Sequence, residues 1–396
     1  MPRKLLRAIL FFVAFSITSF ALAENYTLVK VHVRNAFDYQ RLINSDLDTA
    51  ECVNHLGSND VLVGAGDWPK LWNLGLRYTL AGVVDASLPA RGQEATDYRN
   101  EYFNADEIIA FYEGLRAQDP AFVSRKEIGR SINNEPIWAY KIGHPTNAKN
   151  ANNIIVIGLI HAREWITGSV VMHMAKKSLE TVKDPTISRD FANKNIHFVP
   201  IVNPDGYRYT WTNSRLWRKN RRQVTSTVYG VDLNRNFSKD WGNPAGSSGN
   251  PSSQTYRGTA PFSEPETRAL RDYMLSLPRV GGFCDVHSYS QLVLLPWGHT
   301  SAPTQDSALF EVVGDEMKTA MSAFGATYRA GVGAVILYIA SGISDDYVYD
   351  QYRAIAIGLE MRDTGEFGFL LPPSQISVSQ DEGWAGLRAL VNRVPN

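Results

Sequence analysis

Two residues of metal-binding type stand three positions apart in the first half of the chain. His161 and Glu164 lie in the stretch HAREW at 161–165, directly after an apolar run. On a turn or a first helical turn, this spacing places an imidazole and a carboxylate on one side of the chain. Both groups suit zinc, and a catalytic zinc takes three protein ligands and keeps one position for water. A His-x-x-Glu pair alone is common, so a third ligand is needed to define a site.

The third ligand must come from the remaining histidines, of which the whole chain has eight. His287 ends a second apolar run, and α/β proteins build their sites at the carboxyl ends of strands. His173 is the alternative, but it lies among apolar residues inside an expected helix. A core histidine with a hydrogen-bond partner is the simpler interpretation there. We therefore expect His287 to join His161 and Glu164.

Apolar runs alternate with amphipathic segments along most of the chain. Four of these runs are expected to be strands, at residues 154–160, 196–202, 280–286 and 354–359. The first is apolar throughout, as expected for a strand that is buried on both faces. Helices are expected after the N-cap residue Asn104 and over 170–182, and a loop rich in Gly, Ser, Asn and Pro over 242–255. This alternation predicts an α/β layered fold.

The N-terminus has the pattern of a secretory signal peptide. Arg3, Lys4 and Arg7 precede a mostly apolar stretch that ends in the small-x-small pattern ALA at 21–23. The stretch is short for a transmembrane anchor, and no later segment is apolar for long enough to span a bilayer. We therefore expect residues 1–23 to be removed and the product to be secreted, without a membrane anchor.

The next 68 residues, 24–91, are expected to form a small α+β unit. Its expected strands are residues 26–33, 61–64 and 80–84, and a helix is expected near 38–47. The unit runs into SLPARG at 87–92, a Pro/Gly-punctuated stretch in which a trypsin-like protease could cut at Arg91. This gives a division into 1–23, 24–91 and 92–396.

The overall charge bears on the class of partner. Lys+Arg and Asp+Glu are both 40, so the net charge is zero, which argues against a nucleic-acid-binding protein. The short basic run at 218–222 is expected to be a solvated loop, apart from Arg218.

The two cysteines, Cys52 and Cys284, do not form a disulfide framework. Cys284 lies in an apolar run and is expected to be a buried thiol, although a bridge to Cys52 is also possible.

Several short motifs, in one order, resemble the metallocarboxypeptidases of the pancreatic A/B type, and most closely the B type. They are HAREW (161–165), LWRK (216–219), GVDLNRN (230–236), HSYS (287–290), LY (337–338) with SG (341–342) and DD (345–346), LEMRDTG (359–365) and GFLLP (368–372). The resemblance extends from about residue 104 to the C-terminus. It implies a mixed eight-stranded sheet flanked by helices, with one zinc ion at the C-terminal strand ends. It also implies that residues before Arg91 are an inhibitory prosegment, here shorter than usual.

The same resemblance implies a catalytic role for several residues. His161, Glu164 and His287 would be the zinc ligands, and Asp232 would orient His161 from behind. Glu360 would be the base beside the zinc-bound water, since a proton must move as the water attacks the amide carbonyl. Arg218 would stabilise the oxyanion that forms. All of these residues are present, which argues against a non-catalytic zinc-binding relative.

Other matched positions imply substrate contacts. Asn234, Arg235 and Tyr338 would hold the terminal carboxylate, which makes such an enzyme an exopeptidase. Arg163 and Tyr289 would contact the substrate with a lesser role. The expected enzyme is a monomer that acts on peptide or protein C-termini after activation by a trypsin-like protease.

Asp345 bears on specificity. The resemblance implies that it would lie at the base of the side-chain pocket, a position that is apolar in A-type enzymes and Asp in B-type enzymes. A buried carboxylate favours Lys or Arg and penalises an apolar side chain that leaves the charge unpaired. In the alternative, Asp345 caps the helix expected after Ser344, and the enzyme releases apolar or aromatic residues. Ile343 stands where a small glycine is usual, which affects the expected pocket shape.

Overall fold

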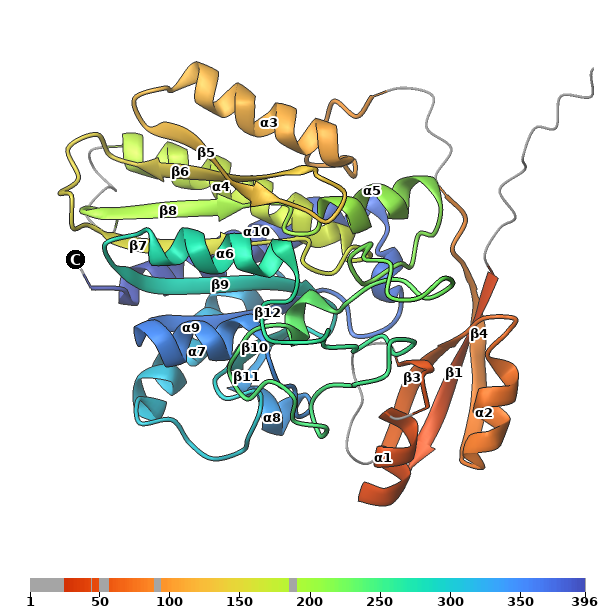
Figure 1. The fold of residues 1–396 in the computed structure, drawn as a ribbon. Helices are drawn as coiled ribbons and strands as arrows, with labels where there is room; N and C mark the ends of the chain where they lie inside the picture. Colours follow the sequence, from red (N-terminus) through yellow and green to blue (C-terminus); the bar gives the residue numbers. More distant parts are fainter. Residues whose placement is uncertain (1–24, 44, 50–56, 89–93, 185–190, 396) are drawn as a thin grey trace, which may run out of the picture.

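The computed structural model describes residues 25–43, 45–49, 57–88, 94–184 and 191–395. The expected signal peptide at 1–23, Cys52 and the expected cleavage site at Arg91 lie outside these residues. The described chain forms a small unit with a four-stranded sheet and a large unit with an eight-stranded sheet (Figure 1). None of the helices in the described ranges is both long and apolar enough to cross a bilayer.

The large sheet has the order β11-β10-β12-β9-β7-β8-β6-β5. Its strands are β5 (Val123–Arg130), β6 (Pro136–Gly143), β7 (Asn152–Ile157), β8 (Lys194–Val199), β9 (Val280–Ser288), β10 (Leu292–Leu295), β11 (Arg329–Val332) and β12 (Ile355–Met361). The central strands β12, β9, β7 and β8 run parallel, whereas β5, β6 and β10 each pair antiparallel with a neighbour. This confirms the expected mixed eight-stranded sheet.

Helices cover this sheet. They are α3 (Ala105–Gln118), α4 (Trp165–Lys183), α5 (Pro204–Thr212), α6 (Pro265–Leu275), α7 (Ser307–Ser322), α8 (Gly333–Ile336), α9 (Ser344–Tyr352) and α10 (Ile376–Arg393), with the short 3-10 turns η1 (Leu233–Arg235), η2 (Gly368–Leu370) and η3 (Pro373–Gln375). Helix α10 packs between α4 and α7, while α9 contacts β9 and β12. Helix α3 begins at the expected cap, because the Asn104 side chain accepts from the amides of Asp106 and Glu107.

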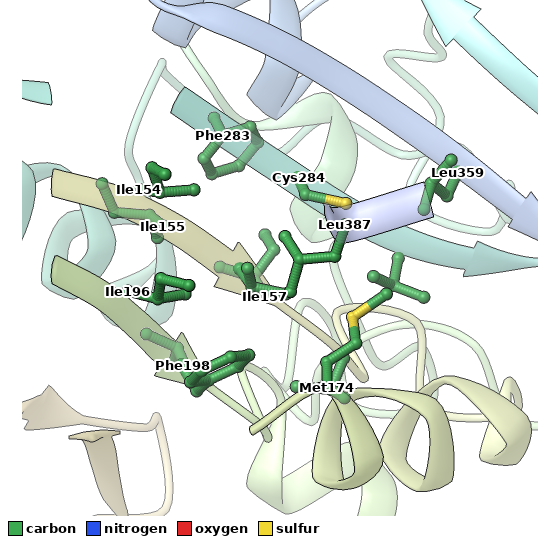
Figure 2. Close-up of a cluster of buried hydrophobic side chains, with 14 of the residues drawn as sticks. Ile154, Ile155, Ile157, Met174, Ile196, Phe198, Phe283, Cys284, Leu359 and Leu387 are labelled. Carbon is green, nitrogen blue, oxygen red and sulfur yellow. The ribbon is translucent and has the colours of Figure 1, made fainter. Parts of the chain in front are cut away.

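The central strands are apolar because both of their faces are covered. All six residues of β7 are buried, as are the seven of β12. Successive strand residues point to opposite faces, so neighbours such as Ile154 and Ile155 pack into different layers. Figure 2 shows side chains of β7, β8, β9 and β12 meeting Met174 of α4 and Leu387 of α10. Cys284 is a free, buried thiol in this core, as expected.

The chain leaves the sheet earlier than expected after β7. The strand ends at Ile157, although the apolar residues up to Ile160 are also buried. Leu159 has a left-handed φ of 51°, which turns the chain out of the ladder while it stays in the core. This turn brings His161 to the strand end, and α4 then begins at Trp165 rather than at the expected residue 170.

The small unit has an α+β fold, as expected. Its elements are β1 (Asn25–Val33), α1 (Ala36–Ile43), β2 (Asp48–Thr49), β3 (Gly57–Val63), α2 (Trp68–Leu74) and β4 (Arg77–Asp85), with strand order β2-β3-β1-β4. It has its own core, which includes Val29, Val31 and Val61. A second apolar cluster joins the two units, in which Leu62 and Ala86 pack with Leu216, Tyr289 and Phe369.

Candidate active site

Three neighbouring parallel strands bring the main candidate residues together. His161 follows β7, while His287 lies in β9 and Glu360 in β12. His287 and Glu360 are register partners in the ladder. Because the three strands are parallel neighbours, their carboxyl ends meet at one edge of the sheet. The structure therefore brings these three predicted residues together at one edge of the sheet.

The buried group His161, Glu164 and His287 has the geometry of a metal site. Its ligand atoms lie within 4.8 Å of one another. Glu164 Oε1 lies 2.8 Å from His161 Nδ1, and its Oε2 lies 3.1 Å from His287 Nδ1. Burial alone would raise the pKa of Glu164, but the two histidines outweigh it and lower the pKa to about 2. Two ring nitrogens facing an ionised carboxylate are a donor set that fits zinc.

Each histidine is held from behind by a carboxylate. His161 Nε2 lies 3.0 Å from Asp232 Oδ1, and His287 Nε2 lies 3.0 Å from Asp285 Oδ2. This arrangement leaves Nδ1 of both rings directed at the metal group. Asp232 was expected, whereas Asp285 was missed. Strand periodicity could have found it, because Asp285 is two positions before His287 and so lies on the same face of β9.

His173 does not belong to this group. Its ring nitrogens instead lie within hydrogen-bond distance of Tyr98, Arg99 and Asp381, which form a separate cluster. Burial and the nearby Arg99 lower the pKa of His173 to about 4. It is a core histidine with partners, as the sequence indicated.

Glu360 lies at the edge of the metal group. Only 4% of the residue is exposed, and its Oε2 has no hydrogen-bond partner among the described residues. Burial raises the pKa of Glu360 to about 8, with His287 opposing the shift. It shares one cavity wall with His161 and His287. A poorly solvated carboxyl group beside a metal site can accept and return a proton.

Arg218 points at the same group. Its Nη2 and Nε lie 3.0 and 3.3 Å from Asp232 Oδ2, and its Nη1 lies 3.8 Å from Glu164 Oε1. The residue is buried. A guanidinium fixed by a carboxylate can stabilise negative charge that develops nearby.

The expectation of a solvated loop after Arg218 was wrong for Lys219, whereas Arg221 and Arg222 are partly exposed. Lys219 is buried, and its Nζ donates to the carbonyl oxygens of Pro251 and Ser253, each at 3.0 Å. Burial lowers the pKa of Lys219 to about 8. Arg221 stacks over the ring of Tyr209 at 3.6 Å. These cations pack against carbonyls and rings, which sequence charge alone does not reveal.

Asn234, Arg235 and Tyr338 lie together at the cavity beside Glu360. Arg235 Nη2 donates to the Tyr338 hydroxyl at 3.2 Å, and Asn234 Nδ2 lies 3.0 Å from His287 Nε2. The cavity has a volume of about 490 Å³. All three residues line it, together with His161, His287, Leu294, Gly298, Gly333, Leu337, Ala340, Ile343, Asp345, Gly358 and Glu360.

Asp345 lines this cavity and does not cap a helix. Helix α9 has Ile343 at its N-cap position, without a side-chain capping hydrogen bond. The neighbouring Asp346 instead accepts from the amides of Gly298 and His299. Burial, together with the charges of Asp346 and Asp285, raises the pKa of Asp345 to about 8. A side chain added at Gly358 would approach its Oδ2 to 3.5 Å.

Arg163 and Tyr289 lie on the side of the cleft that the small unit covers. Arg163 is fully buried, and its Nη1 donates to Asp48 Oδ2 of β2 at 2.5 Å. Its guanidinium lies 4.0 Å over the ring of Phe369. Tyr289 packs edge-on against the same ring. Both expected substrate contacts are thus occupied by residues of the N-terminal unit and by Phe369.

A buried His-Glu-His group with a carboxyl group beside it, at the carboxyl ends of parallel strands, fits a metal-dependent hydrolase. Residues 108–386 match the profile of the zinc carboxypeptidase family. Carboxypeptidase B of Bos taurus is 34% identical over 329 residues, covering 81% of this chain and 78% of that protein. Carboxypeptidase A1 of Rattus norvegicus is 37% identical over 294 residues, covering 74% and 70%.

Solved structures agree with this match. Bovine thrombin-activatable fibrinolysis inhibitor, solved in complex with tick carboxypeptidase inhibitor, has a TM-score of 0.69 at 30% identity, covering 75% of this chain and 99% of that one. Carboxypeptidase A from Helicoverpa armigera shares the fold, with a TM-score of 0.83 at 24% identity over 94% of this chain and 98% of that one. The chain belongs to the zinc carboxypeptidase family. It is therefore a peptide hydrolase that uses one zinc ion.

Proposed function

We propose that this zinc carboxypeptidase releases C-terminal Lys or Arg from peptides. The observation that carries the proposal is the buried carboxyl group of Asp345, which lines the same cavity as Glu360. A cation that enters this cavity would pair with Asp345, whereas an apolar side chain would leave a desolvated charge or require its protonation. The glycines Gly298, Gly333 and Gly358 also line this cavity, and the Ile343 side chain fills the space beside Gly298.

The chain's own groups would divide the catalytic work among them. His161, Glu164 and His287 would hold the zinc, which when bound acts as a Lewis acid and makes water more acidic. Glu360 would take a proton from the attacking water and return it to the leaving amine. Arg218, fixed by Asp232, would stabilise the oxyanion.

The substrate's terminal carboxylate would bind opposite the specificity pocket. Arg235 and Tyr338 already form a hydrogen-bonded pair at the cavity, and Asn234 lies beside His287. A planar guanidinium can bind a carboxylate through two parallel hydrogen bonds. Only the last residue of a chain has that carboxylate, so this contact would restrict cleavage to the final peptide bond.

Peptides that differ only in the last residue test the specificity. We expect kcat/KM to be higher for peptides ending in Arg or Lys than for those ending in Phe or Leu. Asp345→Leu should lower activity on the basic peptides at least ~100-fold and spare the apolar ones. Asp345→Asn is the matched control that keeps the side-chain volume. Activity on Arg peptides that survives both changes would favour A-like specificity.

We also propose that the protein is a secreted, monomeric zymogen with the prosegment 24–91. The ion pair between Asp48 and Arg163 supports this, since the small unit occupies a predicted substrate contact. The apolar cluster around Leu62 and Tyr289 adds a second contact. Trypsin treatment should convert a weakly active protein of one mass into an active, shorter one with its new N-terminus near residue 92. Sedimentation and sequencing of the exported protein would test the monomeric state and removal of residues 1–23.

A further inference from the structure

Asp285 connects the metal group to the specificity pocket. Its Oδ2 lies 3.0 Å from His287 Nε2 and also accepts from the hydroxyl of Ser344, the residue before Asp345. The side chain is 1% exposed. Its Oδ1 is buried and has no hydrogen-bond partner among the described residues. One oxygen therefore makes both contacts, and the other faces the protein interior without a donor.

Three carboxyl groups gather at this end of the cavity, but they are not equivalent. Asp346 accepts from two backbone amides and lies 2.6 Å from His299 Nδ1, so hydrogen bonds satisfy it. Asp345 lines the cavity. Asp285 does not line the cavity, but the hydrogen bond from the Ser344 hydroxyl holds its carboxylate beside the residue that precedes Asp345. The charges of Asp346 and then Asp285 both raise the pKa of Asp345. Asp285 and Asp345 therefore interact through a region from which water is largely excluded, where charges act over longer distances than in water.

We propose that Asp285 has two roles, as a positioning residue for His287 and as a second determinant of the preference for a cationic C-terminal side chain. This inference rests on the proposed function. A cation beside Asp345 is attracted by both carboxylates, while a neutral side chain gains nothing from either. Selectivity should thus depend on a residue that does not line the cavity.

Asp285→Asn isolates the charge. The amide oxygen can still accept from His287 and Ser344, and the new amide nitrogen takes the place of the oxygen that has no partner. Asp232→Asn is a matched control, because Asp232 holds Nε2 of the other histidine at the same 3.0 Å but bonds to Arg218 instead of Ser344. Asp285→Ser is the second neutral variant if the first does not fold, and Asp285→Glu restores the charge.

Kinetics on the full chain, with and without trypsin treatment, would compare peptides ending in Arg and in Leu. For Asp285→Asn we expect the ratio of the two kcat/KM values to fall roughly ten-fold. For Asp232→Asn we expect both values to fall by the same factor. Calorimetry on the zinc-depleted protein should show weaker binding of free arginine to Asp285→Asn, with binding of leucine unchanged. Asp285→Glu should keep the ratio of the wild type.

The outcomes separate the inference from the function on which it rests. If the wild type prefers Arg and both neutral variants at position 285 keep that preference, the role of Asp285 is wrong and the proposed function stands. If Asp285→Asn, like Asp232→Asn, lowers kcat/KM by the same factor for the Arg and Leu peptides, Asp285 only positions its histidine. If the wild type shows no preference for Arg, the proposed specificity fails, and the inference fails with it.

Discussion

The ion pair between Asp48 and Arg163 gives a quantitative test of the proposed latency. Arg163 is fully buried, and its Nε and Nη2 have no hydrogen-bond partner among the described residues. The carboxylate of Asp48 at 2.5 Å therefore compensates much of a desolvated charge. Asp48→Asn keeps a hydrogen-bond acceptor in place and removes the negative charge. The small unit should dock more weakly as a result.

The size of the effect follows from the burial of the pair. Removing one partner of a fully buried ion pair costs about 3–5 kcal/mol. Asp48 retains 11% exposure of its side chain, and its replacement still accepts a hydrogen bond, so we take about 2 kcal/mol. This corresponds to roughly a thirty-fold larger fraction of molecules with an open cleft.

The assay is peptide hydrolysis by the untreated protein, followed by trypsin treatment. Asp48→Asn should raise activity before trypsin about thirty-fold and leave the activity after trypsin unchanged. Asp46→Asn is the matched control, because Asp46 accepts from the neutral side chain of Asn250. It should change the untreated activity less than about three-fold. Equal untreated activities of Asp48→Asn and the wild type would refute the reasoning.

Three further predictions concern the metal, the base and a buried acid. A chelator should abolish hydrolysis and lower the thermal midpoint, and added zinc should restore both, since ligand binding stabilises the folded state. Glu360→Gln should lower kcat at least ~100-fold while the measured zinc content stays at one per chain. Burial raises the pKa of Glu266 to about 7 from 4.5, so the folded protein binds this proton more tightly than the unfolded chain. Stability from this group is full below pH 4.5 and lost as the pH rises to about 7. The unfolding free energy of the wild type should therefore fall between pH 5 and pH 8, whereas that of Glu266→Gln should not. The difference between the two proteins should shift by about 2 kcal/mol in favour of Glu266→Gln over this range, measured by urea titration.

The sequence predicted the central strands and the metal group well, because both rest on strong local patterns. Continuous apolar runs mark β7 and β12, and motif order marks His161 and His287. Strands β5, β6, β10 and β11 were not predicted. Strand β5 is largely exposed and carries Lys, Arg and Glu, while β10 and β11 have only four residues each. The burial of Lys219 could not be predicted either. It depends on two carbonyl groups more than thirty positions away in the sequence, and no local pattern reports such partners.

The position of the metal ligands also determines when the protein can acquire its ion. His161 and His287 are 126 residues apart in sequence and meet only when β7 and β9 have paired. Before that pairing, the chain offers His161 and Glu164 alone, which is too few ligands for tight binding. Metal uptake would then be a late event during folding, and bound zinc would report that the middle of the sheet is complete. A nascent chain still lacking β9 would compete only weakly for the ion.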